Sequence, residues 1–195
     1  MAARKTSPRR RRRRIVYEVA VSADGFLARP DGDVGWLDRP MPKGFYGMAK
    51  FFQSIDTLVM GRKTWEVGQK LGGSPFPGMT TYVFSRKRRR IAAPPGTELV
   101  RETPKAFAAK LRARPGKDIW LMGGGELFGA FLDAGEVDQI SLHVIPVFIG
   151  EGIPLIGPRH RHVELRRTAH RVFPDGVVHL TYEVVGRNRR SARLG

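Results

Sequence analysis

The alternation of apolar and polar positions along the chain predicts short strands separated by amphipathic helices. Residues 15–22 alternate as a strand does, with Tyr17, Val19 and Val21 on one face. Apolar runs of the length of buried strands follow, and between them apolar residues recur at helical spacing. These patterns predict strands at 57–61, 80–85, 98–101, 119–122 and 139–147, and helices over 45–55, 104–114 and 126–134.

The end of the chain has a different pattern. Residues 163–173 and 177–185 alternate on either side of Pro174-Asp-Gly176, which is typical of a turn between antiparallel strands. Strands that alternate with helices favour a parallel sheet, so an added hairpin implies a mixed sheet. The sequence has no internal repeat and no linker within the core. We therefore expect one α/β domain over residues 15–186.

Three consecutive glycines lie between an expected strand and an expected helix, in the sequence DIWLMGGGELF of residues 118–128. Glycines there let the backbone approach a ligand, and the helix start presents unpaired N–H groups that suit a phosphate. The alternative is a tight strand–helix turn without a ligand. Phe128 stands where the usual dinucleotide fingerprint has Gly or Ala, so an ordinary Rossmann domain is not expected.

A second unit repeats this arrangement at Gly61-Arg-Lys-Thr-Trp-Glu66, where an expected strand ends in glycine and a cationic stretch begins a helix. A third expected strand ends at Ser85 and leads into the basic run 86–90. Taken alone, that run is typical of a solvated surface.

The composition excludes several kinds of site and of protein. A chain of 195 residues, of which 41% are apolar, suffices for one packed core. The absence of cysteine excludes disulfides, thiolate catalysis and cysteine-held metal sites, and it fits a cytoplasmic protein. No apolar run approaches the length of a membrane span, so no membrane partner is expected.

The net charge of +17 is concentrated at the ends of the chain. Residues 1–14 hold eight basic side chains and no acid, including six consecutive arginines that repel one another. We expect a disordered basic arm over residues 1–14 and a basic tail over 187–195. The arm would bind nucleic acid only weakly, through phosphate neutralisation, and a solvated tail is the alternative.

Four stretches occur together in one order: 20–28 (AVSADGFLA), 56–66 (DTLVMGRKTWE), 80–86 and 119–128. On these stretches the chain resembles the dihydrofolate reductase-like family. The similarity is closest to the branch that includes the reductase domain of riboflavin biosynthesis and many stand-alone bacterial reductases. The resemblance spans residues 15–185 and implies a three-layer α/β fold, with a twisted, mostly parallel mixed sheet flanked by helices.

The resemblance also implies NADPH as the cofactor, lying across the strand ends, and it favours a homodimer. Both glycine turns would hold the pyrophosphate, and cations after two strands would meet the adenosine 2′-phosphate. Ala20 and Leu27 would hold the nicotinamide carboxamide through backbone groups. The pyrophosphate set is Gly61, Arg62, Lys63, Thr64, Gly123, Gly124, Gly125 and Glu126, and the 2′-phosphate set is Arg62, Ser85, Arg86 and Lys87.

The sequence departs from true dihydrofolate reductases at the helix that carries their carboxylate. Residues 42–55 contain no Asp or Glu, so we expect inefficient dihydrofolate reduction. Asp24 and Tyr46 are the candidate catalytic groups, although Asp24 is equally well explained as a turn-former. Trp36 and Phe45 are the candidate substrate contacts, and a loop anchor in the core is the alternative for Trp36.

The histidines of the sequence suggest no metal site. His160 and His162 are flanked by arginines and have no further ligand at the usual spacing, so a solvated loop is expected. His143 and His179 alternate with apolar strand residues and are expected to be satisfied within the sheet.

The sequence therefore predicts an NADPH-dependent reductase that transfers a hydride to a C=N or C=O bond of a small heterocyclic or sugar-derived substrate. The alternatives are the riboflavin-pathway 5-amino-6-(5-phosphoribosylamino)uracil reductase and a non-catalytic nucleic-acid- or anion-binding protein on the same fold.

Overall fold

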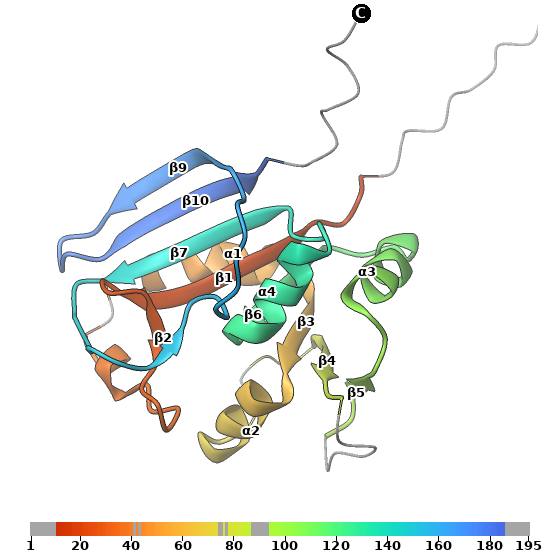
Figure 1. Cartoon of the computed structure of the whole chain (residues 1–195), viewed down its shortest axis with the longest axis horizontal. Helices are drawn as coiled ribbons and strands as arrows, with labels where there is room; N and C mark the ends of the chain where they lie inside the picture. Colours follow the sequence, from red (N-terminus) through yellow and green to blue (C-terminus); the bar gives the residue numbers. More distant parts are fainter. Residues whose placement is uncertain are drawn as a thin grey trace, which may run out of the picture.

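A mixed β-sheet forms the centre of the molecule, with helices on both of its faces (Figure 1). The computed structural model describes residues 11–40, 42, 44–73, 76, 78–86 and 94–185. Within these ranges the sheet has eight strands in the order β5-β4-β3-β6-β1-β7-β10-β9. The strands are β1 (Ile15–Ser22), β3 (Ile55–Gly61), β4 (Thr80–Phe84), β5 (Thr97–Val100), β6 (Asp118–Gly123), β7 (Gln139–Ile145), β9 (Leu165–Val172) and β10 (Val178–Val184).

The sheet is parallel from β5 to β7, and β10 joins it antiparallel to β7. β9 pairs antiparallel with β10 across the Pro174–Gly176 turn. The predicted fold class is confirmed: an α/β fold with a mostly parallel mixed sheet and a C-terminal antiparallel hairpin.

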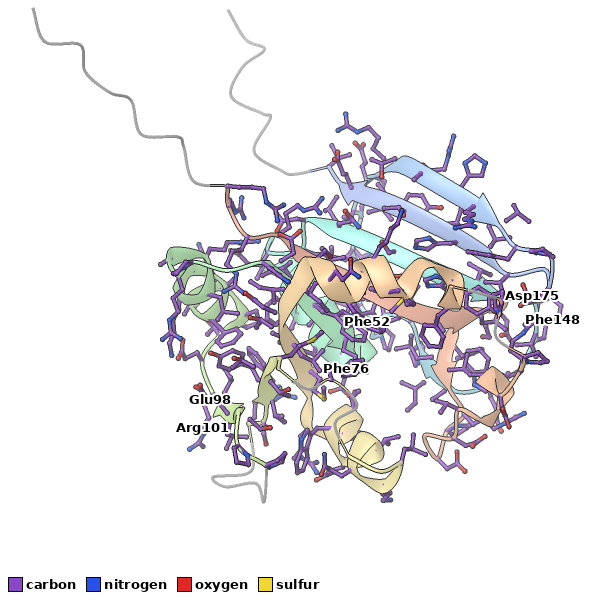
Figure 2. The ribbon with its side chains drawn as sticks, turned by 180° about the vertical axis from the view of Figure 1, so that it is seen from behind. Phe52, Phe76, Glu98, Arg101, Phe148 and Asp175 are labelled. Carbon is purple, nitrogen blue, oxygen red and sulfur yellow. The ribbon has the colours of Figure 1, made fainter. Side chains whose placement is uncertain are left out.

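The two faces of the sheet carry different helices. On one face, α3 (Pro104–Ala113) and α4 (Gly125–Asp133) bury the larger apolar core, in which Tyr17 of β1 stacks on Phe128 with ring centroids 3.7 Å apart. The opposite face carries α1 (Met48–Ser54), whose Phe52 packs against Trp120 of β6 and Phe76 (Figure 2). Trp65 of α2 (Arg62–Lys70) joins this second cluster.

The helix predicted over 45–55 is shorter in the structure. Residues Phe45–Gly47 form a 3-10 turn and α1 begins only at Met48. Phe45 and Tyr46 have positive φ angles of 50° and 54°, which an α-helix does not allow. Gly44 and Gly47, both also left-handed, allow the chain to turn here. Phe45 consequently lies 43% exposed instead of on an inner helical face.

Residues 11–14, the last four of the predicted basic arm, contact the folded domain. Arg11 and Arg14 both contact the buried carboxylate of Asp118, and Arg13 is itself buried against Asp56. Disorder was expected because the arginines repel one another. The fold brings carboxylates next to residues 11–14, and these offset the repulsion there. Residues 1–10 and the basic tail at 187–195 lie outside the described residues.

A small two-stranded sheet that the sequence did not predict lies beside the main one. β2 (Phe26–Ala28) pairs antiparallel with β8 (Ile153–Pro154), which belongs to a stretch expected to be only a connection. A 3-10 turn, Gly35–Leu37, follows β2. Within the described ranges, no helix combines the length and the apolar composition needed to cross a bilayer.

Candidate active site

The two predicted glycine turns meet at the carboxyl ends of neighbouring strands. β3 and β6 are hydrogen-bonded neighbours, with Met60 opposite Gly123. The N–H of Gly124 donates to Oγ1 of Thr64 over 3.2 Å, which joins the start of α2 to the start of α4. Crevices outside the carboxyl ends of parallel strands are the usual ligand sites of α/β sheets. The structure therefore brings the predicted pyrophosphate residues together, and their role stays a prediction.

The three consecutive glycines at 123–125 have different surroundings. Gly123 has a φ of +153°, which favours glycine, and a side chain there would meet no atom within 4 Å. A Cβ on Gly124 would lie 3.4 Å from Oγ1 of Thr64. A Cβ on Gly125 would lie within 3.0 Å of the carbonyl oxygen of Pro154 in β8. Only Gly123 therefore borders open space, while Gly125 is required by the packing of the protein itself.

The residues expected at a 2′-phosphate lie after adjacent strand ends, because Gly61 of β3 is opposite Phe84 of β4. Arg62 begins α2 and donates to both carboxylate oxygens of Glu66 at 2.6 Å, so it is already paired. Ser85 is buried and donates its backbone N–H to the carbonyl of Val100. Arg86 is exposed, Lys63 and Glu126 are exposed at the two helix starts, and Lys87 lies outside the described residues.

The sheet opens between β1 and β6 beside Ala20. The β1–β6 ladder ends at Tyr17 opposite Leu121, while β1 continues along β7 as far as Ser22. The carbonyl of Glu18 points toward β6, where Trp120 Nε1 donates to it at 2.8 Å. Because backbone groups alternate along a strand, those of Ala20 point the same way, past the end of the ladder. This position suits the backbone contact expected of Ala20, and Leu27 lies nearby on β2, half-buried.

Asp24 holds two loops together. Its carboxylate accepts hydrogen bonds from the Ser22 hydroxyl at 2.6 Å and from the backbone N–H groups of Ile149 and Gly150 at 3.1 and 2.8 Å. The hydrogen bond from Ser22, followed by those from the backbone, lowers the pKa of Asp24 below its ordinary value. A carboxylate that stays ionised is a poor proton donor, so these contacts match the turn-forming alternative.

Replacement of Asp24 by asparagine should make the free energy of unfolding depend less on pH in the acid range. The folded-state pKa of Asp24 is lower than that of the unfolded chain. The stabilisation it gives is therefore complete above the unfolded value of about 3.9 and is lost as the pH falls through the folded value. We expect the variant to be less stable than the parent at pH 7, with the difference shrinking below pH ~4. Urea denaturation at several pH values measures this, and a constant difference would contradict it.

Tyr46 is hydrogen-bonded to the turn between β9 and β10. Its hydroxyl donates to the carboxylate of Asp175, which also pairs with Arg39 at 3.5 Å. Its ring packs edge-on against Phe173. Burial and the hydrogen bond to Asp175 raise the pKa of Tyr46. The structure thus shows Tyr46 anchoring the segment before α1, and its predicted catalytic role remains a prediction.

Both predicted substrate contacts are neighbours of Tyr46, Trp36 through its apolar cluster and Phe45 in the sequence. Trp36 packs against the cluster that holds Tyr46 and Phe173, and its indole Nε1 is buried without a hydrogen bond. Phe45 is adjacent in sequence and largely exposed.

Unpartnered buried polar atoms gather around Tyr46. In the described part of the chain, four buried side-chain atoms have no hydrogen bond: Glu18 Oε1, Trp36 Nε1, Arg39 Nε and His179 Nε2. Trp36 shares the apolar cluster of Tyr46, and Arg39 shares its partner Asp175. His143, which stacks on His179, lies 3.4 Å through Nε2 from the backbone oxygen of Tyr46. Buried polar groups are normally satisfied, so this concentration makes the region a candidate for binding a ligand.

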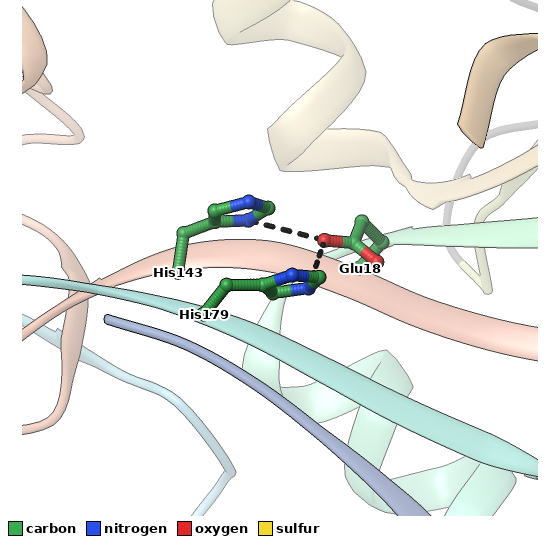
Figure 3. Close-up of side chains that lie close together, drawn as sticks. All are labelled: Glu18, His143 and His179. Atoms are coloured by element: carbon green, nitrogen blue, oxygen red, sulfur yellow. Dashed lines mark ion pairs between the residues drawn. The ribbon is translucent and has the colours of Figure 1, made fainter. Parts of the chain in front are cut away.

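A buried group on three strands was not recognised from the sequence. Glu18 of β1, His143 of β7 and His179 of β10 converge on the face of the sheet next to Tyr46 (Figure 3). Glu18 Oε1 lies 3.1 Å from His143 Nδ1 and 3.4 Å from His179 Nε2. Burial raises the pKa of Glu18, but the two imidazoles together outweigh it and lower that pKa below its ordinary value. One signal was present, because a glutamate interrupts the strand 15–22.

Comparison with known proteins identifies relatives along most of the chain. The model of the RibD C-terminal domain family matches residues 13–179. The uncharacterized protein YwjB of Bacillus subtilis (strain 168) is 34% identical over 166 residues, which cover 85% of this chain and 95% of that protein.

Solved structures show the same fold. A putative riboflavin biosynthesis protein from Shewanella sp. PV-4 superposes with a TM-score of 0.74 and 23% identity, over 88% of this chain and 98% of that one. Dihydrofolate reductase from Enterococcus faecalis, complexed with NADP(H), gives a TM-score of 0.64 and 19% identity, over 88% and 96% of the two chains.

Proposed function

We propose that this chain, which belongs to the RibD C-terminal domain family, is an NADPH-dependent reductase acting on a C=N or C=O bond of a small heterocyclic or sugar-derived substrate. The family and the fold support an oxidoreductase of the riboflavin-pathway type. The enzyme that reduces 5-amino-6-(5-phosphoribosylamino)uracil is one reductase of this class.

The observation that carries the proposal is the contact between the two glycine turns. A dinucleotide carries its two phosphates next to each other, so both helix starts have to face one molecule. The hydrogen bond from Gly124 to Thr64 fixes α2 and α4 in that relation. Each helix start adds unpaired N–H groups and a partial positive charge. The residues present therefore fit a pyrophosphate.

NADPH, when bound, would supply the hydride, and the protein would bind and orient the reactants. The backbone of Ala20, at the opening between β1 and β6, would hold the nicotinamide end. Trp36, with its unpartnered indole N–H, would donate a hydrogen bond to the substrate. Residues 42–55 offer no carboxylate to a pterin, so we expect dihydrofolate turnover to fall short of a true reductase by about 10²–10⁴.

Coenzyme selection tests the proposal. We expect NADPH to bind at least about tenfold more tightly than NADH, because a charge-assisted hydrogen bond to the 2′-phosphate contributes about 1.5–3 kcal/mol. Arg62→Ala and Arg86→Ala should each weaken NADPH binding by about tenfold and leave NADH binding unchanged. Nicotinamide fluorescence titrations at fixed ionic strength give both affinities.

Glu66→Gln is the matched control for Arg62. The variant removes the ion pair that occupies Arg62, so NADPH should bind as tightly as in the parent, or more tightly. Equal affinity for the two coenzymes would refute the 2′-phosphate assignment. Failure of the folded protein to bind either coenzyme would overturn the proposed function.

A further inference from the structure

Glu18, His143 and His179 form a group that the proposed reductase chemistry does not use. They come from three adjacent strands, with His143 opposite both Ala20 of β1 and His179 of β10. One ligand atom from each residue lies within 4.8 Å of the others. Adjacent strands of one sheet carry all three side chains, which come together on one face of that sheet (Figure 3).

Each ring nitrogen of His143 lies near an oxygen atom. Its Nε2 lies 3.4 Å from the backbone oxygen of Tyr46, and a carbonyl oxygen only accepts, so a hydrogen bond between them places the ring proton on Nε2. In a neutral ring, Nδ1 then presents a lone pair to the carboxylate oxygen of Glu18 at 3.1 Å. Two acceptors at that distance repel one another unless a proton or a metal ion lies with them.

We propose that Glu18 Oε1, His143 Nδ1 and His179 Nε2 bind a divalent transition-metal ion of the Zn²⁺ type. Two imidazoles and a carboxylate are a donor set that such ions prefer. Ligands bound at about 2.1 Å lie about 3.0–3.4 Å from one another in octahedral or tetrahedral geometry. The observed separations of 3.1 and 3.4 Å from Glu18 Oε1 fall in that interval.

The outer contacts of the group also fit an ion. A metal-binding histidine normally donates its other ring N–H to a carbonyl or carboxylate, as the Nε2 of His143 is placed to do toward Tyr46. Glu18 Oε1 and His179 Nε2 are both buried and neither makes a directed hydrogen bond. A divalent ion would be bound by all three atoms at once.

Binding requires one adjustment. The rings of His143 and His179 are parallel to within 2°, with centroids 4.1 Å apart, and an imidazole binds a metal in its own ring plane. One ring must therefore turn. His179, whose side chain is 25% exposed against 8% for His143, has the room to do so and also provides the entry path.

The consequence for catalysis rests on the proposed function, although ion binding itself does not. Three protein ligands leave coordination positions open on the ion. A substrate held beside Ala20 could place a carbonyl oxygen or ring nitrogen at one of these positions, where the ion would polarise it. The preferred substrates would then be heterocycles or carbonyl compounds that offer such a donor atom next to the reduced bond.

Titration of the full, untagged chain with Zn²⁺ and with Co²⁺ tests the site. We expect one ion per chain by calorimetry, and for Co²⁺ a visible absorption band of a nitrogen- and oxygen-ligated ion. Glu18→Gln and His179→Gln should each weaken binding by more than the ~10–100-fold typical of losing an outer contact of a metal ligand. The double variant of His160→Gln and His162→Gln, on an exposed loop, is the matched control and should bind as the parent does.

Three results would overturn the site: no stoichiometric binding to the parent, binding unaffected by Glu18→Gln, or binding abolished only in the loop control. NADPH affinity is measured on the same proteins without metal. Unchanged NADPH affinity in Glu18→Gln shows that the variant is folded. If the parent protein does not bind NADPH, the proposed reductase function is contradicted, but the metal site is not.

Discussion

Gly125→Ala is expected to lower the free energy of unfolding by about 3 kcal/mol, the upper end of what overpacking costs. The new Cβ would come within 3.0 Å of the Pro154 carbonyl oxygen and to 3.2 Å from that of Leu155. Both are backbone atoms, and the N–H of Gly157 donates to the Gly125 carbonyl, so the two segments are tied together at this point. The clash can be relieved only by moving β8 away from α4, which also displaces the turn at Gly124. Urea denaturation measures the loss.

Gly68→Ala is the matched control. Gly68 lies inside α2, and a Cβ there meets no atom within 4 Å. Because alanine has a higher helix propensity than glycine, this variant should gain about 0.5–1 kcal/mol. Equal effects of the two substitutions would show that Gly125 is not held by β8.

The strands were predictable because their signal is local. Alternation over 15–22 and the apolar runs at 57–61 and 119–122 depend on neighbouring residues alone, and the structure places β1, β3 and β6 there. The two glycine turns share this property, since each is a strand end followed directly by a helix start. Their contact follows from β3 and β6 being neighbours in the sheet.

The features that were missed depend on contacts between distant residues. Helix α1 begins later than predicted because Phe45 and Tyr46 take left-handed conformations, which cannot be predicted from these residue types. β2 and β8 are separated by more than a hundred residues, and β8 has only two of its own. Neither residue type nor periodicity identifies such a strand.

The buried Glu18 group shows the same limit at the candidate site. His143 and His179 alternate correctly with apolar residues, so each reads as an ordinary strand residue. Only the register of β1, β7 and β10 places them against Glu18. The sequence left Asp24 open between a catalytic group and a turn-former, and in the structure its carboxylate accepts hydrogen bonds from Ser22 and from the backbone at 149–150.

Arg13→Ala is expected to destabilise the fold by about 3 kcal/mol, although the residue belongs to an arginine run expected to be solvated. The Arg13 side chain is 6% exposed, pairs with Asp56, and donates to the Lys117 carbonyl at 2.6 Å and to Thr57 Oγ1 at 2.7 Å. Removing one partner of a buried pair costs about 3–5 kcal/mol. The lower value is expected here because the Asp56 side chain, 36% exposed, regains some hydration.

Arg12→Ala separates this effect from the loss of a positive charge. Arg12 is adjacent in sequence, 62% exposed, and lies 3.6 Å from Asp138. An exposed pair of this kind contributes about 0–1 kcal/mol, so Arg12→Ala should change stability by no more than that. Urea denaturation of both variants at pH 7 and moderate salt makes the comparison. If both lose the same small amount, the first strand does not depend on a buried arginine, and the arm would extend to residue 14 as repulsion alone predicts. If only Arg13→Ala is destabilised, the fold uses the end of the basic run to tie β1 to β3 and to the segment that leads into β6.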